Sequence, residues 1–209
     1  MERMKGSMLL LTVAAVMVYC GLLQRVLDRL RMRDRTALLL IGAMLLGTFV
    51  PPLRLGLVQL NLGGALIPLG VCTALFFGAD ETHERWRTVL GSLLTGVAVY
   101  ALTRLLPAEP EELFADPTLL CCLAGGAIAW LLGRSRRGAF ICGVTGLLLA
   151  DLISAVLLWR RGVMQTLYLG GGGLADAAVI SGMLGVLLCE LVGEAAERIC
   201  RCRERRAAR

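Results

Sequence analysis

Long uncharged runs alternate with short charged segments along the whole chain. The uncharged runs cover residues 8–24, 36–53, 55–79, 88–103 and 117–133, and two further runs, 138–159 and 162–189, each contain one aspartate. Runs of about 20 apolar residues have the length of a helix that crosses a bilayer. Inside a bilayer, backbone polar groups must be hydrogen-bonded within the protein, which allows only helices or a closed β-barrel. The runs lack the alternation of apolar and polar residues that is typical of barrel strands. The pattern therefore predicts a helical membrane protein.

We expect an all-α fold, a polytopic membrane bundle of about seven transmembrane helices (six to eight). The predicted helices lie near residues 8–24, 36–51, 62–78, 88–106, 118–133, 138–159 and 171–193. A single bundle domain is expected over residues 1–197, followed by a basic cytoplasmic tail over residues 198–209.

One segment departs from a simple helical pattern. Asn61, Gly63, Gly64 and Pro68 fall within eight residues and follow two consecutive prolines. This composition predicts either a broken helix that lines a cavity or a kinked helix packed through small residues. Partial alternation over residues 53–62 also predicts a short extended or hairpin piece before the third helix.

Composition and charge placement fit the same picture. The chain has 209 residues, of which 57% are hydrophobic and 18% charged, which excludes a water-soluble globular enzyme of this length. Seven helices place 16 of the 22 basic residues on one side, which predicts an external N-terminus and a cytoplasmic C-terminus. The net charge of +6 then points to the bilayer, and to anionic lipids beside the cytoplasmic arginines, rather than to nucleic acid.

The cysteines and the single histidine suggest no metal site or cofactor. Six of the eight cysteines lie in apolar runs, where cysteine behaves as a small hydrophobe. His83 stands alone, so a histidine-rich metal site and a Ser-His-Asp triad are not available. The glycine run at residues 170–173 lacks the strand and the Lys-Ser/Thr sequence of a phosphate-binding loop.

Two aspartates inside apolar runs carry the candidate chemistry. An aspartate near a helix centre costs roughly 2.5–3.5 kcal/mol on insertion scales, so Asp151 and Asp176 need partners or a purpose. Asp151 lies eight residues before Trp159, and Asp176 lies eight residues after Tyr168. If both stretches were helical, each carboxylate would lie about 12 Å below the external interface. Paired carboxylates in a dry site share a proton, which suits proton-coupled transport or aspartyl hydrolysis.

A structural role competes with that interpretation. Asp176 follows four glycines and is equally well placed to cap the last helix. Asp151 is expected to face the bundle interior, with Thr145 and Ser154 as local partners, because its run contains no other charge.

Four motifs connect the chain to a known family. They are residues 31–52 with Gly47-Thr-Phe-Val-Pro51, Asn61-Leu-Gly-Gly-Ala-Leu-Ile-Pro68, Gly146-Leu-Leu-Leu-Ala-Asp151-Leu, and Gly170-Gly-Gly-Gly-Leu-Ala-Asp176-Ala-Ala-Val-Ile-Ser-Gly182. Over most of its length the chain resembles the membrane proteins of domain-of-unknown-function family 1614. It departs at Leu149 and Ala177, where the family pattern has glycine. The resemblance implies a multi-pass fold in which Asn61, Asp151 and Asp176 share one site, and it implies no activity.

The chain is also similar, more weakly, to intramembrane aspartyl proteases. It departs from them because no tyrosine precedes Asp151, two residues separate Gly173 from Asp176, and no later Pro-Ala-Leu motif is present. The connection between the two helices is also predicted to lie outside, where those enzymes have it in the cytoplasm.

Three functional hypotheses follow. The leading one is a small transporter or ligand-binding membrane protein that is not driven by ATP. A proton or cation and a small ligand would bind at Asn61, Gly63, Gly64, Pro68, Asp151 and Asp176. The second hypothesis is an intramembrane aspartyl hydrolase with Asp151 and Asp176 as catalytic residues, and the third is a scaffold subunit without small-molecule chemistry. Of these, the non-enzymatic interpretations are favoured.

Overall fold

The computed structural model describes residues 42–44, 46–47, 49–78, 82–105, 117–133, 135–171 and 176–207. Its elements in chain order are β1 (Leu53–Leu55), β2 (Val58–Leu60), the π-helix η1 (Leu62–Leu66), α4 (Ile67–Phe77), α5 (Thr82–Leu105), α6 (Pro117–Gly133), α7 (Arg136–Arg160), β3 (Leu167–Leu169) and α8 (Ala177–Ala207). Residues 42–44, 46, 47 and 49 are also helical.

Five of the seven predicted helices correspond to helices in the structure. The predicted helix at 8–24 and most of the one at 36–51 lie outside the described residues. Two boundaries were wrong by about a turn and a half. The polar residues from Thr82 onward are part of α5, and α8 begins at Ala177 because strand β3 and a turn precede it. Helix α8 then continues to Ala207, so the backbone of the expected basic tail is helical over most of its length.

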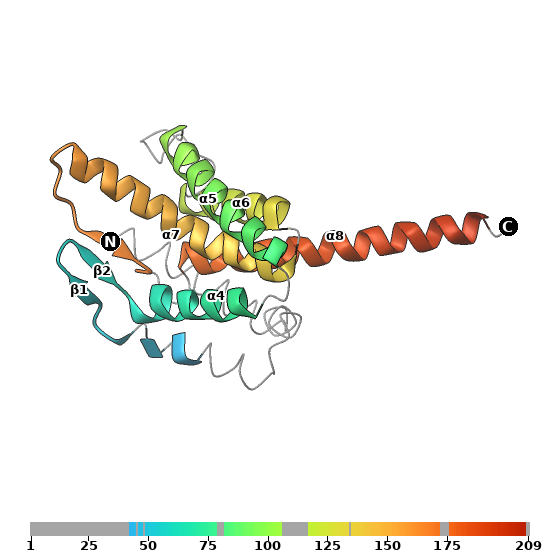
Figure 1. Cartoon of the computed structure of the whole chain (residues 1–209), viewed down its shortest axis with the longest axis horizontal. Helices are drawn as coiled ribbons and strands as arrows, with labels where there is room; N and C mark the ends of the chain where they lie inside the picture. The colour runs from blue at the N-terminus through green and yellow to red at the C-terminus, as the bar shows by residue number, and fades with distance from the viewer. Residues whose placement is uncertain are drawn as a thin grey trace.

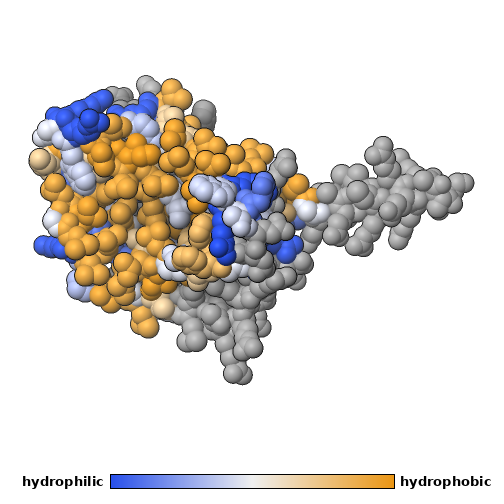
Figure 2. Space-filling model, viewed as in Figure 1, coloured by the Kyte–Doolittle hydropathy of each residue, from blue (hydrophilic) through white to orange (hydrophobic). Residues whose placement is uncertain are grey.

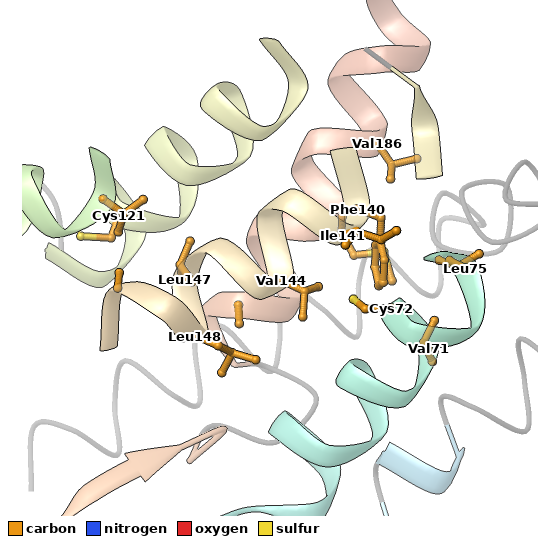
Figure 3. Packing of buried hydrophobic residues seen from close by; sticks show 14 residues of the cluster. Val71, Cys72, Leu75, Cys121, Phe140, Ile141, Val144, Leu147, Leu148 and Val186 are labelled. Atoms are coloured by element: carbon orange, nitrogen blue, oxygen red, sulfur yellow. The ribbon is translucent and has the colours of Figure 1, made fainter. Parts of the chain in front are cut away.

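Helix α7 is the centre of the bundle. It packs against α4, α5, α6 and α8, while α6 also packs against α5 and α8 (Figure 1). The C-terminal half of α8 projects away from the bundle (Figure 1). An apolar cluster lines the faces that these helices turn toward α7 (Figure 3). Its members include Val71, Cys72, Phe140, Ile141, Val144, Leu147 and Val186.

Glycines allow the helices to approach one another closely. A Cβ atom on Gly143 of α7 would lie 2.6 Å from the Cα atom of Gly182 on α8. A Cβ atom on Gly96 of α5 would lie 3.0 Å from the carbonyl oxygen of Gly146 on α7. Small residues at helix contacts are typical of packing in lipid, where burial of apolar surface gives no driving force between helices.

The segment before α4 contains the hairpin that the alternation predicted. Strands β1 and β2 pair antiparallel, with a turn at Gly56, whose φ is +62°. Strand β3 then adds to β2 in parallel, with Val58 opposite Leu167 and Leu60 opposite Leu169. The three strands form one small sheet in the order β1-β2-β3.

Polar contacts tie the opposite end of the bundle together. Arg87 on α5 donates to the carbonyl oxygen of Gly133 at the end of α6, at 2.7 Å. The Ser135 hydroxyl, which caps α7, donates to a carboxylate oxygen of Glu84 on α5, at 2.6 Å. The end of α6 and the starts of α5 and α7 are therefore fixed to one another.

Within the described residues, two helices, α5 and α7, are long and apolar enough to cross a membrane. The apolar parts of the other helices are shorter and cover Leu62–Phe77, Leu120–Gly133 and Ala177–Gly193. Much of the outer surface is also apolar, and Figure 2 shows hydrophilic residues gathered in separate groups on such a face.

The close contact between α7 and α8 can be tested with one methyl group. We expect Gly143→Ala to lower the free energy of unfolding by about 1–3 kcal/mol, because the added Cβ would overlap Gly182. Gly70→Ala in α4 is the matched control, since a Cβ there meets nothing within 4 Å and alanine favours helix. Thermal unfolding of the detergent-solubilised protein measures both, and equal midpoints for the two variants would contradict a close approach of α7 to α8 at this glycine.

Candidate functional site

Strands β2 and β3 lie side by side, and each is followed by the start of a helix. Strand β2 ends at Leu60, and Asn61 then begins η1 and α4. Strand β3 ends at Leu169, and the chain continues to Asp176, which precedes α8. Because β2 and β3 are parallel, both helices begin at the same end of the bundle. Each of these two helix starts contains a candidate site residue predicted from the sequence, Asn61 in the first and Asp176 in the second.

Asn61 caps the first of the two helix starts. Its side-chain oxygen accepts hydrogen bonds from the backbone N–H groups of Gly63 at 2.9 Å and Gly64 at 3.4 Å. The first turn is wound as a π-helix, and Leu66 N donates to the carbonyl oxygen of Asn61. Pro68 follows at the start of α4 and is fully buried. Because proline has no N–H, it leaves the regular helical ladder incomplete there, a common setting for a π-turn.

Gly64 brings the first helix start into direct contact with the turn after β3. A Cβ atom on Gly64 would collide with the backbone of Gly170, and one on Gly170 would collide with the backbone of Gly64 and Ala65. Gly170 has φ +73°, a conformation that favours glycine. Asn61 N also donates to the carbonyl oxygen of Leu169 at 3.0 Å. The break at 61–68 is therefore packed against this turn, and Gly64 is required for the close approach.

Asp176 caps α8, as one of the two interpretations of this residue expected. Its Oδ1 accepts a hydrogen bond from Ala178 N at 3.0 Å, and its carbonyl oxygen accepts one from Ile180 N at 3.0 Å. A carboxylate at this position pairs an N–H group that has no partner within the helix and lies at the positive end of the helix dipole.

Asp151 lies on an exposed side of α7, so the expectation that it faces the bundle interior was wrong. Within the described part of the chain it makes no hydrogen bond or ion pair. The two expected partners are engaged elsewhere, since Ser154 donates to the carbonyl oxygen of Ala150 and Thr145 to the hydroxyl of Ser92. Asp151 is exposed because α8 begins at its level, so the last turns of α7 extend past the start of its neighbour.

The structure places Asp151 and Asp176 at similar depths in the bundle. Gly143 packs against Gly182, and Ala139 against Gly185, so α7 and α8 are antiparallel. From the Gly143–Gly182 contact, Asp151 lies about 12 Å along α7 and Asp176 about 9 Å back along α8. Along the helix pair the two carboxyl groups therefore differ in depth by only about 3 Å.

The reason for this matched depth differs from the one expected. The sequence argument assumed a helix from Tyr168 to Asp176, but Tyr168 lies in β3 and Gly170 in a left-handed turn. The matched depth instead comes from the contact between α7 and α8 at Gly143 and Gly182. Asn61 makes no described contact with either aspartate.

Sequence reasoning missed one polar contact between the central helices. The hydroxyl oxygens of Ser92 on α5 and Thr145 on α7 lie 2.8 Å apart. Single serines and threonines occur throughout apolar helices, so their pairing becomes visible only once the helices are placed. Among the described residues, no group of three or more His, Cys, Asp or Glu side chains could hold a metal ion.

The capping role of Asp176 can be separated from its charge. Asp176→Ala should lower the free energy of unfolding by about 1 kcal/mol, because Ala178 N loses its acceptor. Asp176→Asn keeps an acceptor oxygen and should stay within a few tenths of a kcal/mol of the parent protein. Unfolding midpoints of the three proteins check this, and equal losses in both variants would show that the charge, not the cap, stabilises α8.

Comparison with protein-family models identifies a family for this chain. The family model described as "Protein of unknown function (DUF1614)" matches residues 23–188, which is most of the chain and includes Asn61, Asp151 and Asp176. No match was found among curated proteins or among solved structures. The chain therefore belongs to the DUF1614 family, as its four motifs had suggested.

Proposed function

We propose that this chain is a multi-pass membrane protein in which Asp151 and Asp176 together hold one exchangeable proton or cation. Binding of that ion would be coupled to the binding or movement of a small ligand, without ATP. The observation that carries the proposal is the close antiparallel contact of α7 and α8, which places both carboxyl groups at nearly the same depth beside the start of α8. Two helices of spanning length and an apolar outer surface support the membrane location.

Two negative charges at this site would oppose each other. Coulomb repulsion grows as the surroundings become less polar, and a second carboxylate nearby disfavours the charged form of the first. One proton or one small cation between the groups removes this repulsion.

The position along α7 suits access from one side. Asp151 lies nine residues before Arg160, or about 13.5 Å from that end of the helix. Asp151 is exposed, and α8 begins beside it. The last turns of α7, from Asp151 to Arg160, therefore extend beyond the start of α8 toward one side of the membrane. In the proposed orientation this is the external side, so ions would enter from outside the cell.

The break at residues 61–68 is the second part of the proposal. Non-helical backbone at membrane depth is tolerated where it is buried in protein or lines a cavity. Asn61 holds the start of η1, and Gly64 packs on Gly170, six residues before Asp176. We propose that the break positions the turn that leads to Asp176, and that Asn61, Gly63 and Pro68 act by keeping this geometry rather than as primary ligands.

The two other hypotheses fit these contacts less well. An aspartyl hydrolase needs both carboxyl groups to hold one water, whereas Asp176 gives one oxygen to a backbone N–H. A scaffold subunit would leave both aspartates satisfied by caps and backbone donors. Asp176 meets that condition, but Asp151 has no hydrogen-bond partner within the described residues.

Carbodiimide labelling tests the ion site without knowledge of the ligand. Dicyclohexylcarbodiimide modifies protonated carboxyl groups in apolar surroundings, so we expect it to label Asp151 in reconstituted vesicles. Labelling should fall as the pH rises, and it should also fall in the presence of Na⁺ if the exchangeable ion is a cation. Mass spectrometry of the peptide that contains Asp151 measures both effects.

Two controls make this result specific. Asp151→Asn should abolish labelling of that peptide, and Glu190, which pairs with Arg136 at 3.8 Å, should remain unlabelled. Labelling of Asp151 that is the same in Asp176→Asn as in the parent would argue against a shared ion. Labelling that responds to neither pH nor Na⁺ would exclude an exchangeable ion.

The membrane orientation is tested separately. We expect the chain to remain in the membrane fraction after alkaline extraction. A tag after Arg209 should be cleaved by protease only from the cytoplasmic side, because most basic residues are predicted there. Cleavage from the external side would reverse the proposed orientation.

A further inference from the structure

We propose that the groove between α4 and α5 binds one anionic phospholipid, with an acyl chain in the groove and its phosphate at Arg137 and Arg85. This inference rests on the membrane location in the proposed function, but not on the aspartate pair. The two arginines lie at the end of the bundle opposite to the aspartates, and the groove extends from there along α7 as far as Leu149.

The groove has α7 as its floor and α4 and α5 as its walls. Its volume is about 360 Å³, at the lower end of the range of roughly 300–1,000 Å³ found for ligand pockets. It opens on the side of the bundle, and apolar side chains form most of its lining. The lining residues used below are Thr73, Phe76, Thr88, Ser92 and Thr145.

The hydroxyl groups in the groove are already paired. Thr73 donates to Leu69 O, and Thr88 to Glu84 O. Ser92 donates to Thr88 O, at 2.8 Å, and accepts from the Thr145 hydroxyl. A polar ligand would therefore find few free donors here, whereas a hydrocarbon chain needs none. The chemistry of the lining favours an acyl chain.

Positive charge is placed at one end of the groove. Arg85 donates to the carbonyl oxygen of Phe77 at 3.1 Å, and Arg137 to that of Gly78 at 2.8 Å. These carbonyls directly follow Phe76, which lines the groove, so both guanidinium groups lie near that end of it. A guanidinium has five N–H donors and suits phosphate, and Arg137 uses one of its donors on Gly78 O.

An exposed tryptophan, Trp86, lies at the same end of α5 as Arg85. Trp86 follows Arg85 on α5, and 66% of its surface is accessible. Tryptophan and arginine at one end of an apolar helix are typical of the headgroup region. Ser92 lies six residues further along α5, or about 9 Å deeper, so a lipid with its phosphate at the arginines would extend its chain into the groove.

Photolabelling in vesicles tests this site directly. The protein is reconstituted in phosphatidylcholine vesicles that contain a trace of phosphatidylglycerol or phosphatidylcholine with a diazirine on one acyl chain. We expect the phosphatidylglycerol probe to label the peptides of α4 and α5 that line the groove several-fold more than the phosphatidylcholine probe. Equal labelling by both probes would show an ordinary lipid annulus and overturn the proposal.

Two pairs of variants test where the phosphate and the acyl chain of the lipid bind. Arg137→Gln should reduce the preference for phosphatidylglycerol roughly fivefold, since one arginine near anionic lipid contributes about 1 kcal/mol. Arg104→Gln, at the far end of α5, should leave it unchanged. Thr73→Trp should exclude the acyl chain, whereas Ala74→Trp, equally exposed but outside the groove, should not.

The remaining outcomes are also decisive. No groove labelling by either probe, in protein that resists alkaline extraction, would mean that another part of the chain occupies the groove and that the lipid proposal is wrong. Protein that alkali extracts from the membrane would refute the proposed membrane location instead. Thermal unfolding of each variant shows whether a lost label reflects lost structure.

Discussion

The structure depends on how the backbone N–H groups at two helix starts are paired inside an apolar bundle. An unpaired backbone group away from water costs about as much as a lost hydrogen bond, and in lipid it costs more. Asn61 supplies an acceptor for the first helix start, and Asp176 supplies one for the second. The strands that lead to these residues pair with each other, so their backbone groups are also satisfied. The small sheet is therefore what lets two helices begin below the end of α7.

Capping alone does not explain why the residue at position 176 is charged. Asparagine and aspartate cap helices about equally well, so a cap alone would not require a carboxylate at 176. The chain has the neutral residue at Asn61 and the acidic one at Asp176, and only the acidic one lies at the depth of another carboxyl group. With both groups charged, an aspartate there would add a repulsion with Asp151 that an asparagine would avoid. The proposed function assigns a purpose to that repulsion, because a shared proton or cation relieves it.

The sequence predicted the helical architecture well and the site only in part. Uncharged runs located five of the described helices, since a continuous apolar stretch is a strong signal, and alternation located the hairpin before α4. The start of α8 was missed because four glycines do not reveal whether the chain is extended or helical. The exposure of Asp151 was missed for a related reason, since it depends on where the neighbouring helix begins. Asn61 was grouped with the aspartates by motif, but a side chain that caps its own helix has the same sequence signature as one that faces a ligand.

The central claim is that Asp151 and Asp176 titrate as one coupled pair. Infrared difference spectroscopy of the reconstituted protein, recorded as a function of pH for the parent, Asp151→Asn and Asp176→Asn, measures this most directly. The account predicts a carboxyl signal that disappears in Asp151→Asn and whose titration midpoint moves in Asp176→Asn, a variant that keeps the helix cap. A signal from Asp151 that titrates at the same pH in the parent and in Asp176→Asn would contradict the account.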